Sequence, residues 1–210
     1  LTRTSAEVLS DLLAVLDPLP NHQPLGMMVI VTKERTVFIS DTTVNEMPDS
    51  IQLADIASQT ADAARKLGHE PRVAMLSFST FGNPKHKRLN SVLEAVKLLD
   101  ERDVDFEYDG EMAADVALNR TLMEIYPFCR LSGPANILIM PGINSAHISS
   151  KVLQELGGGT VIGPLLVGLE RPAQIVPMGS TVSAIVNLAA LAGHGAAEKE
   201  ILKTSLLRRA

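Results

Sequence analysis

The clearest candidate for a binding site is the turn Met178-Gly179-Ser180-Thr181, which follows an apolar run and precedes a helical pattern. The apolar positions of that pattern are Val182, Ile185, Val186 and Ala189. A strand, a tight turn and a helix N-terminus in this order leave backbone N–H groups free, and α/β proteins use such groups to hold anions. The turn carries no Arg, Lys, Asp or His. The turn is therefore predicted to bind a ligand through its backbone, and it lacks the charged side chains that catalysis needs.

A second candidate is the hydroxyl-rich stretch Ser77–Asn83, which leaves a buried-strand pattern as a turn. Its Ser and Thr side chains and backbone amides offer several donors to a phosphate or thioester oxygen. An ordinary strand-to-helix loop capped by Ser or Thr has the same composition. Both interpretations stay open on these residues alone.

Three carboxylates, Asp109, Glu111 and Asp115, lie just past another expected strand, where α/β folds place their sites. They are suited to acid-base work or to Mg²⁺. A turn followed by acidic residues that favour a helix dipole explains them equally well. We expect no metal site, because no His or further ligand lies nearby and the five His of the chain show no metal-ligand spacing.

The sequence contains neither a dinucleotide-binding glycine loop nor a nucleophile elbow. The glycines at 157–159 follow a helical pattern and precede a strand, whereas a dinucleotide loop follows a strand and opens a helix. We interpret them as a helix C-cap. The nucleophile elbow G-x-S-x-G is absent, and Cys129 has no base beside it in the sequence.

The elements that must position these residues alternate along the chain. Residues 5–16 predict a helix stopped by Pro18 and Pro20, two β-rich runs flank the polar residues 33–35 as in a hairpin, and a capping box at 49–52 opens a helix that Gly68 ends. Further strands are expected at 72–79, 104–108, 136–141, 160–163 and 174–177, with helices near 89–99, 113–126, 148–156 and from 182. This alternation predicts a three-layer α/β/α fold with a mostly parallel mixed sheet.

Composition narrows the class of partner. A net charge of -5, 3% aromatic residues and no Trp disfavour nucleic acid, and no apolar run reaches the roughly 18 residues of a membrane span. The single Cys129 and the lack of a signal-peptide pattern predict a cytoplasmic protein. The sequence starts at Leu1 rather than at Met, so we expect a piece of a longer protein.

Five ordered blocks over roughly residues 20–195 carry a family resemblance: "DTTVN", "LSFSTFGNP", "DGEMAADVAL", "LSGPANILIMPGINSAHISSKVLQELGGGTVIGPLLVGLERP" and "MGSTVSAIVNLAAL". They resemble the phosphate acetyl/butyryltransferase (phosphotransacetylase) family. More narrowly, "FEYDGEMAADVAL" and "YPFCRLSGPAN" look like the C-terminal phosphotransacetylase-like domain of bacterial hybrid NADP-dependent malic enzymes.

The resemblance implies two α/β subdomains around a cleft in which acetyl-CoA and phosphate exchange an acetyl group, a fold of the isocitrate and isopropylmalate dehydrogenase type. The chain then holds a truncated two-lobe domain. Its expected parts are a connecting helix (1–19), the second subdomain (20–163), a closing segment of the first subdomain (164–197) and a tail (198–210).

Charged residues of active family members are replaced in this chain. The Ser and Arg of the family's Asp-Leu-Ser-Arg-Gly turn correspond to Pro177 and Met178, and a helix Asp proposed to help deprotonate the CoA thiol corresponds to Ala184. Further replacements place Glu155 at an Arg, Phe81 at the Lys of a Ser-Thr-Lys-Gly turn, and Ala113 at a Gln. If Thr181 is the helix N-cap, position 184 is N3, where an Asp also serves a helix start.

These replacements predict binding without turnover, because acetyl transfer to phosphate needs cations beside the dianion and the oxyanion. The resemblance implies an acetyl-CoA-sensing, oligomer-forming domain that regulates a separate N-terminal malic enzyme domain, where NADP and Mg²⁺ or Mn²⁺ bind. Expected to line the acetyl-CoA site are Ser79, Thr80, Ser132, Asn136, Asn144, Met178, Gly179, Ser180 and Thr181, with no catalytic residue among them. Two alternatives are an active phosphate acetyltransferase that uses Lys151 or Arg171, and a purely structural dimerisation module.

Overall fold

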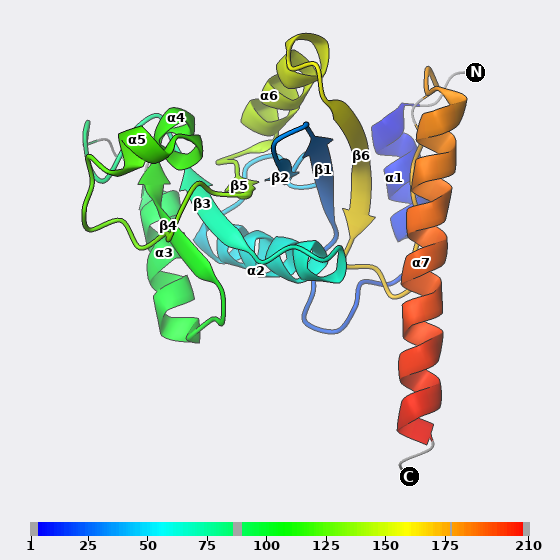
Figure 1. Cartoon of the computed structure of the whole chain (residues 1–210). Helices are drawn as coiled ribbons and strands as arrows, with labels where there is room; N and C mark the ends of the chain where they lie inside the picture. The colour runs from blue at the N-terminus through cyan, green and yellow to red at the C-terminus, as the bar shows by residue number, and fades with distance from the viewer. Residues whose placement is uncertain (1–3, 86–89, 177, 208–210) are drawn as a thin grey trace.

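A computed structural model describes residues 4–85, 90–176 and 178–207 of the chain (Figure 1). Its elements in chain order are α1 (Ser5–Leu13), β1 (Leu25–Val31), β2 (Thr36–Ser40), α2 (Ser50–Lys66), β3 (Arg72–Leu76), α3 (Asn90–Arg102), β4 (Glu107–Met112), α4 (Ala114–Leu118), α5 (Arg120–Met123), β5 (Ile137–Ile139), α6 (Ile143–Leu156), β6 (Thr160–Val167) and α7 (Val182–Leu207).

The strands form one six-stranded sheet in the order β4-β3-β5-β2-β1-β6. Strands β4, β3, β5 and β2 are mutually parallel, whereas β1 is antiparallel to both β2 and β6. The predicted hairpin around residues 33–35 is therefore confirmed as β1–β2. A mostly parallel mixed sheet is confirmed as well.

Helices cover both faces of the sheet, so the expected three layers are present. In β1, Met27 and Val29 belong to the core shared with α2 and α3, and the alternate residues Met28 and Ile30 belong to the core shared with α4, α5 and α6. A strand buried on both faces has no polar alternation, which explains the continuous apolar run of β1.

Local signals place the ends of α2 as the sequence predicts. Asp49 and Gln52 form the capping box, with each side chain accepting from the other's backbone N–H at 2.9 and 3.0 Å. Gly68 follows the C-cap with φ +84°, a left-handed conformation that side-chain-bearing residues rarely adopt.

Three sequence predictions differ from the structure around β4, α4 and β6. The strand expected at 104–108 runs from Glu107 to Met112, and the single helix expected at 113–126 is broken at Asn119. Asn119 has extended backbone angles, and its side chain accepts from Thr121 N at 2.9 Å, so it stops α4 and caps α5. Strand β6 continues from Thr160 to Val167 across the expected boundary at 163/164.

The apolar run 174–176 forms no strand, which corrects a further expectation. The Gln174 side chain accepts from Leu166 N at 2.9 Å and donates to Leu166 O at 3.3 Å. The Gln174 side chain thus occupies backbone groups of β6 to which a seventh strand would have to hydrogen-bond. Pro177 lies outside the described residues.

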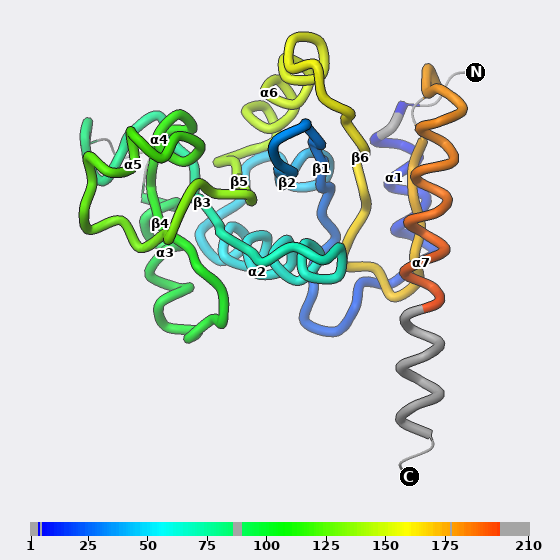
Figure 2. Tube along the Cα trace, in the orientation of Figure 1, coloured from blue at the N-terminus to red at the C-terminus, as the bar shows by residue number. Residues whose placement is uncertain are grey.

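Helix α7 packs beside β6, with Leu188 buried in the same core as α2, and Leu9 of α1 packs against Leu166 and Leu169 (Figures 1 and 2). The predicted stripe of α7 faces away from this contact, because Val182, Ile185 and Val186 are exposed. The helix continues beyond residue 197, where the tail was expected to begin. None of the described helices is both long enough and apolar enough to span a membrane.

Candidate functional site

The segments that follow β3 and β5 donate hydrogen bonds to the carboxyl ends of the neighbouring strands. Behind β3 and β4, Ser77 N donates to Met112 O at 2.9 Å and Phe81 N donates to Glu111 O at 2.8 Å. Behind β2 and β5, Met140 N donates to Ser40 O at 2.8 Å. This edge of a parallel sheet is where α/β folds place ligands.

A cavity of about 470 Å³ opens at this edge, between the loops that follow β3 and β5 and the helix α6. Its polar groups are the hydroxyls of Ser77, Ser145 and Ser149, and its walls are apolar, formed by residues such as Phe78 and Met140. Among the described residues, which omit 86–89, no charged side chain lines it. The cavity is suited to a ligand portion that is apolar and accepts a few hydrogen bonds.

Glu111 holds the loop that forms one wall of this cavity. Its side chain is fully buried, and Oε1 accepts from Ser79 Oγ at 2.9 Å and from Gly82 N at 2.7 Å. The turn is tight, since Phe81 and Gly82 have φ of 49° and 85°. The Thr80 hydroxyl accepts from Ala113 N at 3.0 Å. Ser79 and Thr80 thus lie at the expected edge, where their hydroxyls fix the loop.

Asp41 plays the corresponding role behind β2. The carboxylate is buried and accepts five hydrogen bonds, from Gly26 N, Thr43 N, Val44 N, Asn45 N and Asn45 Nδ2, at 2.6–3.2 Å. Two buried acids therefore shape two loops of this edge by accepting hydrogen bonds from the residues of those loops.

The ring of Phe81, the residue expected from the resemblance to replace a Lys, belongs to an aromatic cluster. The ring centroid lies 5.3 Å from that of Tyr126 and 5.0 Å from that of Phe128. Such distances are those of stabilising edge-to-face and tilted pairs. Position 81 therefore contributes packing in this chain.

Asn144 lies in the first turn of α6, next to Ser145, and is exposed. Asn144 was expected at the site from the sequence, whereas Ser145 and Ser149, which line the cavity, were not. Their four-residue spacing on one helix, directly after a strand end, is the signal that points to them. Ser77 was likewise hidden inside the hydroxyl-rich stretch, where no pattern separates it from the loop-fixing Ser79.

Ser132 and Asn136 lie at the opposite edge, which corrects the expectation that they share one cleft with Ser79 and Thr80. Asn136 precedes β5, and its side chain accepts from Arg72 N and donates to Glu70 O, both at 2.7 Å. Ser132 N donates to Glu107 at the start of β4. Residues before and after a parallel strand emerge at opposite ends of the sheet, so these two are separated from the carboxyl edge.

The turn 178–181 is a third, separate location. Met178 is 81% exposed, and the Thr181 hydroxyl accepts from Ala184 N at 3.2 Å. Thr181 is thus the N-cap and Ala184 is N3, as the sequence suggested. Gly179 and Ser180 complete the turn, and residues 178–181 do not belong to the lining of the cavity at Ser77, Ser145 and Ser149.

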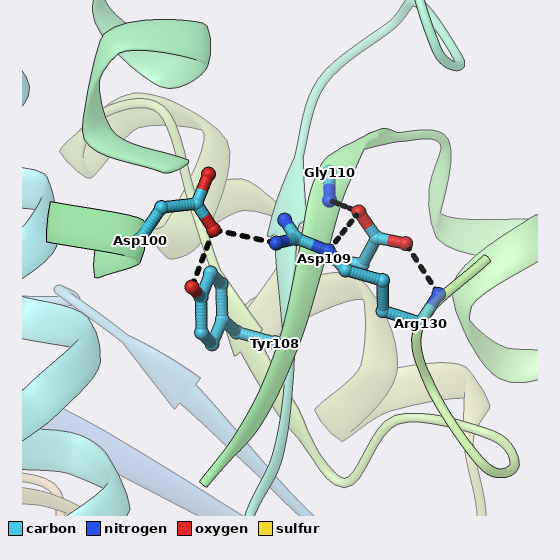
Figure 3. A network of polar contacts seen from close by, with 5 residues as sticks. All are labelled: Asp100, Tyr108, Asp109, Gly110 and Arg130. Carbon is cyan, nitrogen blue, oxygen red and sulfur yellow. Dashed lines mark hydrogen bonds and ion pairs between the residues drawn. The ribbon is translucent and has the colours of Figure 1, made fainter. Parts of the chain in front are cut away.

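The three carboxylates Asp109, Glu111 and Asp115 do not converge, and the first two lie within β4 rather than past it. Asp109 accepts from Gly110 N at 2.8 Å, from Arg130 N at 2.7 Å and from Arg130 Nε at 3.4 Å (Figure 3). Glu111 binds the Ser79 loop, and Asp115 accepts from Val116 N on α4. In the part of the chain that the structure describes, no three His, Cys, Asp or Glu side chains gather as metal ligands.

The Asp109 contacts extend to Asp100 and Tyr108 (Figure 3). Asp100 Oδ1 accepts from Tyr108 OH and from Arg130 Nη1, both at 2.5 Å, and the Arg130 guanidinium lies 4.6 Å from the Tyr108 ring centroid. The Tyr108 hydroxyl and then Arg130 lower the pKa of Asp100, while burial and the Asp100 carboxylate raise the pKa of Tyr108 to about 12. This network fastens the segment before β5 to the edge strand β4.

The chain is similar to two groups of curated proteins. It is 57% identical to an NADP-dependent malic enzyme of Rhizobium meliloti (strain 1021), over 93% of this chain and 26% of that protein. It is 34% identical to a phosphate acetyltransferase of Bacillus subtilis (strain 168), over 78% of this chain and 51% of that protein. The chain therefore spans about a quarter of the length of such malic enzymes.

Solved structures agree with the sequence similarity. A phosphotransacetylase from Streptococcus pyogenes superposes with a TM-score of 0.86 at 30% identity, over 93% of this chain and 61% of that chain. The EutD phosphotransacetylase from Staphylococcus aureus superposes with a TM-score of 0.81 at 32% identity, over 88% and 58%. A sequence model of one family, described as phosphate acetyl/butaryl transferase, matches residues 1–193. The chain belongs to the phosphate acetyl/butaryl transferase family.

Proposed function

We propose that this chain is an acetyl-CoA-binding regulatory and assembly module of an NADP-dependent malic enzyme, and that its own site does not transfer acetyl groups. The observation that carries the proposal is the cavity at the carboxyl edge. Its described lining has three hydroxyls and apolar walls and no cation. Acetyl transfer to phosphate needs fixed positive charge, whereas binding of a thioester does not.

The chemistry of the cavity fits the acetyl-pantetheine end of acetyl-CoA. Ser77, Ser145 and Ser149 offer hydroxyl donors to the thioester and amide oxygens of that group. Phe78 and Met140 offer apolar contact to its methyl and methylene groups. The exposed turn at Met178 remains a proposed second contact, on the segment that leads into α7.

The regulatory part of the proposal rests on the relatives. The first malic enzyme named above matches this chain over only 26% of its own length, so most of that protein lies outside the matched region. We propose that a separate N-terminal domain of the same protein decarboxylates malate and binds NADP and Mg²⁺ or Mn²⁺. Acetyl-CoA bound here then lowers the activity of that domain.

The decisive experiment fills the cavity in the full-length protein. Ser145→Leu places a bulky side chain in the cavity. Ser10→Leu makes the same change at an exposed position of α1 and is the matched control. Acetyl-CoA is expected to inhibit malate decarboxylation by the wild type and by Ser10→Leu, and to fail with Ser145→Leu. Equal inhibition of all three proteins, or none of any, contradicts the proposal.

A second candidate is an active phosphate acetyltransferase, which the similarity to the Bacillus subtilis enzyme favours. It requires cations such as Lys151 or Arg171 to act in place of the lost ones. Both are exposed and neither lines the cavity, and Lys151 Nζ donates to Gln154 at 3.3 Å. Thiol release from acetyl-CoA in the presence of inorganic phosphate, which yields CoA and acetyl phosphate, establishes this activity instead if the full-length protein turns over at more than about 1 s⁻¹.

The assembly part of the proposal concerns α6. Ile148, Val152 and Leu156 follow one another at single-turn spacing and are 64%, 50% and 82% exposed. An exposed apolar stripe of this kind is typical of a protein contact, and we propose a second copy of the chain as the partner. Val152→Glu is expected to lower the sedimentation-derived mass of the full-length protein, and Gln154→Glu on the same helix is the control. An unchanged mass for Val152→Glu contradicts this part.

A further inference from the structure

A larger cavity, of about 850 Å³, lies at the amino edge of the same sheet, at the opposite end of the strands from the site described above. It is formed where the chain enters β2, β3 and β5 and faces α4 and α5. The basic residues that line it are Arg35, Arg72, Arg120 and His69. Three arginines around one cavity are unexpected in a chain whose net charge is -5.

Two of these arginines are held in place by backbone carbonyls. Arg35 Nη1 donates to Leu118 O at 2.8 Å, and Arg72 Nε donates to Pro134 O at 3.0 Å. Strand β5 lies between β2 and β3, so the two backbones are about 10 Å apart, within the span of two long side chains. Across the described residues, no further hydrogen bond of either guanidinium is recorded, and each keeps N–H donors for a ligand.

The backbone around Arg72 is itself fixed. Asn136 accepts from Arg72 N and donates to Glu70 O, both at 2.7 Å, and Asn136 also lines the cavity. Ordering these groups therefore costs little when a ligand binds, because the folded chain already holds them. A guanidinium fixed by one bond presents its remaining donors as a fork that matches a phosphate.

The acidic residues of the cavity narrow the ligand class. Glu34 and Asp115 line the cavity together with the arginines. An ionised carboxylate only accepts hydrogen bonds, so these two groups repel a second phosphate and suit hydroxyl donors. We propose that the cavity binds a phosphorylated sugar or polyol, with the phosphate on Arg35 and Arg72 and the hydroxyls on Glu34 and Asp115. Of its lining, this cavity shares only Ala114 with the proposed acetyl-CoA cavity.

Ribose 5-phosphate is the probe for the test, with ribose and inorganic phosphate as its two separated halves. Calorimetry on the full-length protein is expected to detect ribose 5-phosphate, to detect inorganic phosphate more weakly and to detect no ribose. Arg72→Gln and Arg35→Gln are each expected to weaken binding by at least about tenfold. Arg65→Gln is the control, since it removes one charge from α2 at a residue that pairs with Asp105 outside the cavity.

The proposal is overturned if ribose 5-phosphate does not bind, if both cavity variants bind it unchanged, or if Arg65→Gln weakens binding equally, which indicates bulk electrostatics. Arg35 is exposed and replacing it does not disturb Asn136, so Arg35→Gln decides the test if Arg72→Gln unfolds. Acetyl-CoA is added as a further arm. If saturating acetyl-CoA abolishes ribose 5-phosphate binding by direct competition, the two ligands share one site and the separate cavity is rejected.

Discussion

The hydroxyl of Ser79 donates to the buried carboxylate of Glu111 at 2.9 Å, across two neighbouring parallel strands. The same carboxylate oxygen accepts from the backbone of the loop that Ser79 begins. The acid of β4 therefore shapes the wall of the cavity at the carboxyl edge without lining it.

Replacing Glu111 tests this loop-holding role. Glu111→Ala leaves the Ser79 hydroxyl and Gly82 N–H without their acceptor, so we expect a loss of about 3 kcal/mol in the free energy of unfolding. Glu111→Gln keeps one acceptor oxygen and is expected to lose about 1 kcal/mol. Denaturant unfolding measures both, and Glu101→Gln on the exposed side of α3 is the control. A loss for Glu111→Gln as large as that for Glu111→Ala contradicts the view that one acceptor oxygen is enough to hold the loop.

Asp41 should be less tolerant of an amide than Glu111. Its Oδ1 accepts from Gly26, Thr43 and Val44, and its Oδ2 accepts twice from Asn45. In Asp41→Asn one oxygen becomes an NH₂ group that faces donors, whichever way the amide turns. We expect a loss of about 2 to 3 kcal/mol by denaturant unfolding, more than for Glu111→Gln. A smaller loss for Asp41→Asn than for Glu111→Gln contradicts the view that both oxygens of Asp41 are needed as acceptors.

The Asp100 network predicts a pH-dependent contribution to stability. The folded-state pKa of Asp100 is lowered, first by the Tyr108 hydroxyl, so its contribution is complete above about pH 4 and is lost as the pH falls. The unfolding free energies of wild type and Tyr108→Phe should therefore differ more at pH 7 than at pH 3. Tyr126→Phe is the control, for which the difference from wild type should not depend on pH. A pH-independent gap for Tyr108→Phe removes Asp100 as the cause.

The interaction of Asp100 with Tyr108 can also be tested by titrating Tyr108. The chain has two tyrosines, so Tyr126→Phe isolates Tyr108 in an absorbance titration of tyrosinate. Burial and the Asp100 carboxylate raise the pKa of Tyr108 to about 12. The stability that this pair contributes is therefore complete below about pH 10 and is lost as the pH rises through about 12. Adding Asp100→Asn should lower the pKa, measured by rapid pH jumps. An unchanged pKa means that burial alone is responsible.

Restoring the family's cations one by one should not restore transfer. Phe81→Lys breaks ring contacts with Tyr126 and Phe128, so we expect a loss of about 2 kcal/mol in unfolding free energy. Met178→Arg changes an exposed side chain and should alter stability by no more than about 0.5 kcal/mol. Met47→Lys, at a fully solvent-facing position, is the control for Phe81→Lys.

The double variant with both cations is the activity test. We expect it to release no thiol from acetyl-CoA and inorganic phosphate above background, because positions 184 and 155 still carry Ala184 and Glu155. Turnover by the double variant above about 1 s⁻¹ contradicts the view that the charges act as a set.

Periodicity and caps predict most of this fold because they act locally. The capping box at Asp49, the left-handed Gly68 and the β1–β2 hairpin are each decided within a few residues. The strand expected at 174–176 is absent because one side chain, Gln174, takes the backbone partners of Leu166, and no local pattern records that competition.

The site was predicted less well, because it depends on which end of a strand a residue leaves. Ser79 and Asn144 follow their strands and lie at the carboxyl edge, whereas Asn136 precedes β5 by one position and belongs to the other edge. The spacing of Ser145 and Ser149 puts both on one face of a helix, but that they line a cavity follows from the position of α6 beside the loop after β3. The family resemblance predicted one cleft lined by nine residues, but the geometry of the strands divides these residues among three locations.

The pairing of β1 with β6 has a consequence for synthesis on the ribosome. β1 pairs with β2 almost at once, but its other neighbour begins roughly 130 residues later in the chain. At a translation rate of about 5 to 20 residues per second, the open side of this apolar strand waits on the order of ten seconds for its partner. The nascent chain is most prone to aggregate during that interval, when a ribosome-associated chaperone has most to protect.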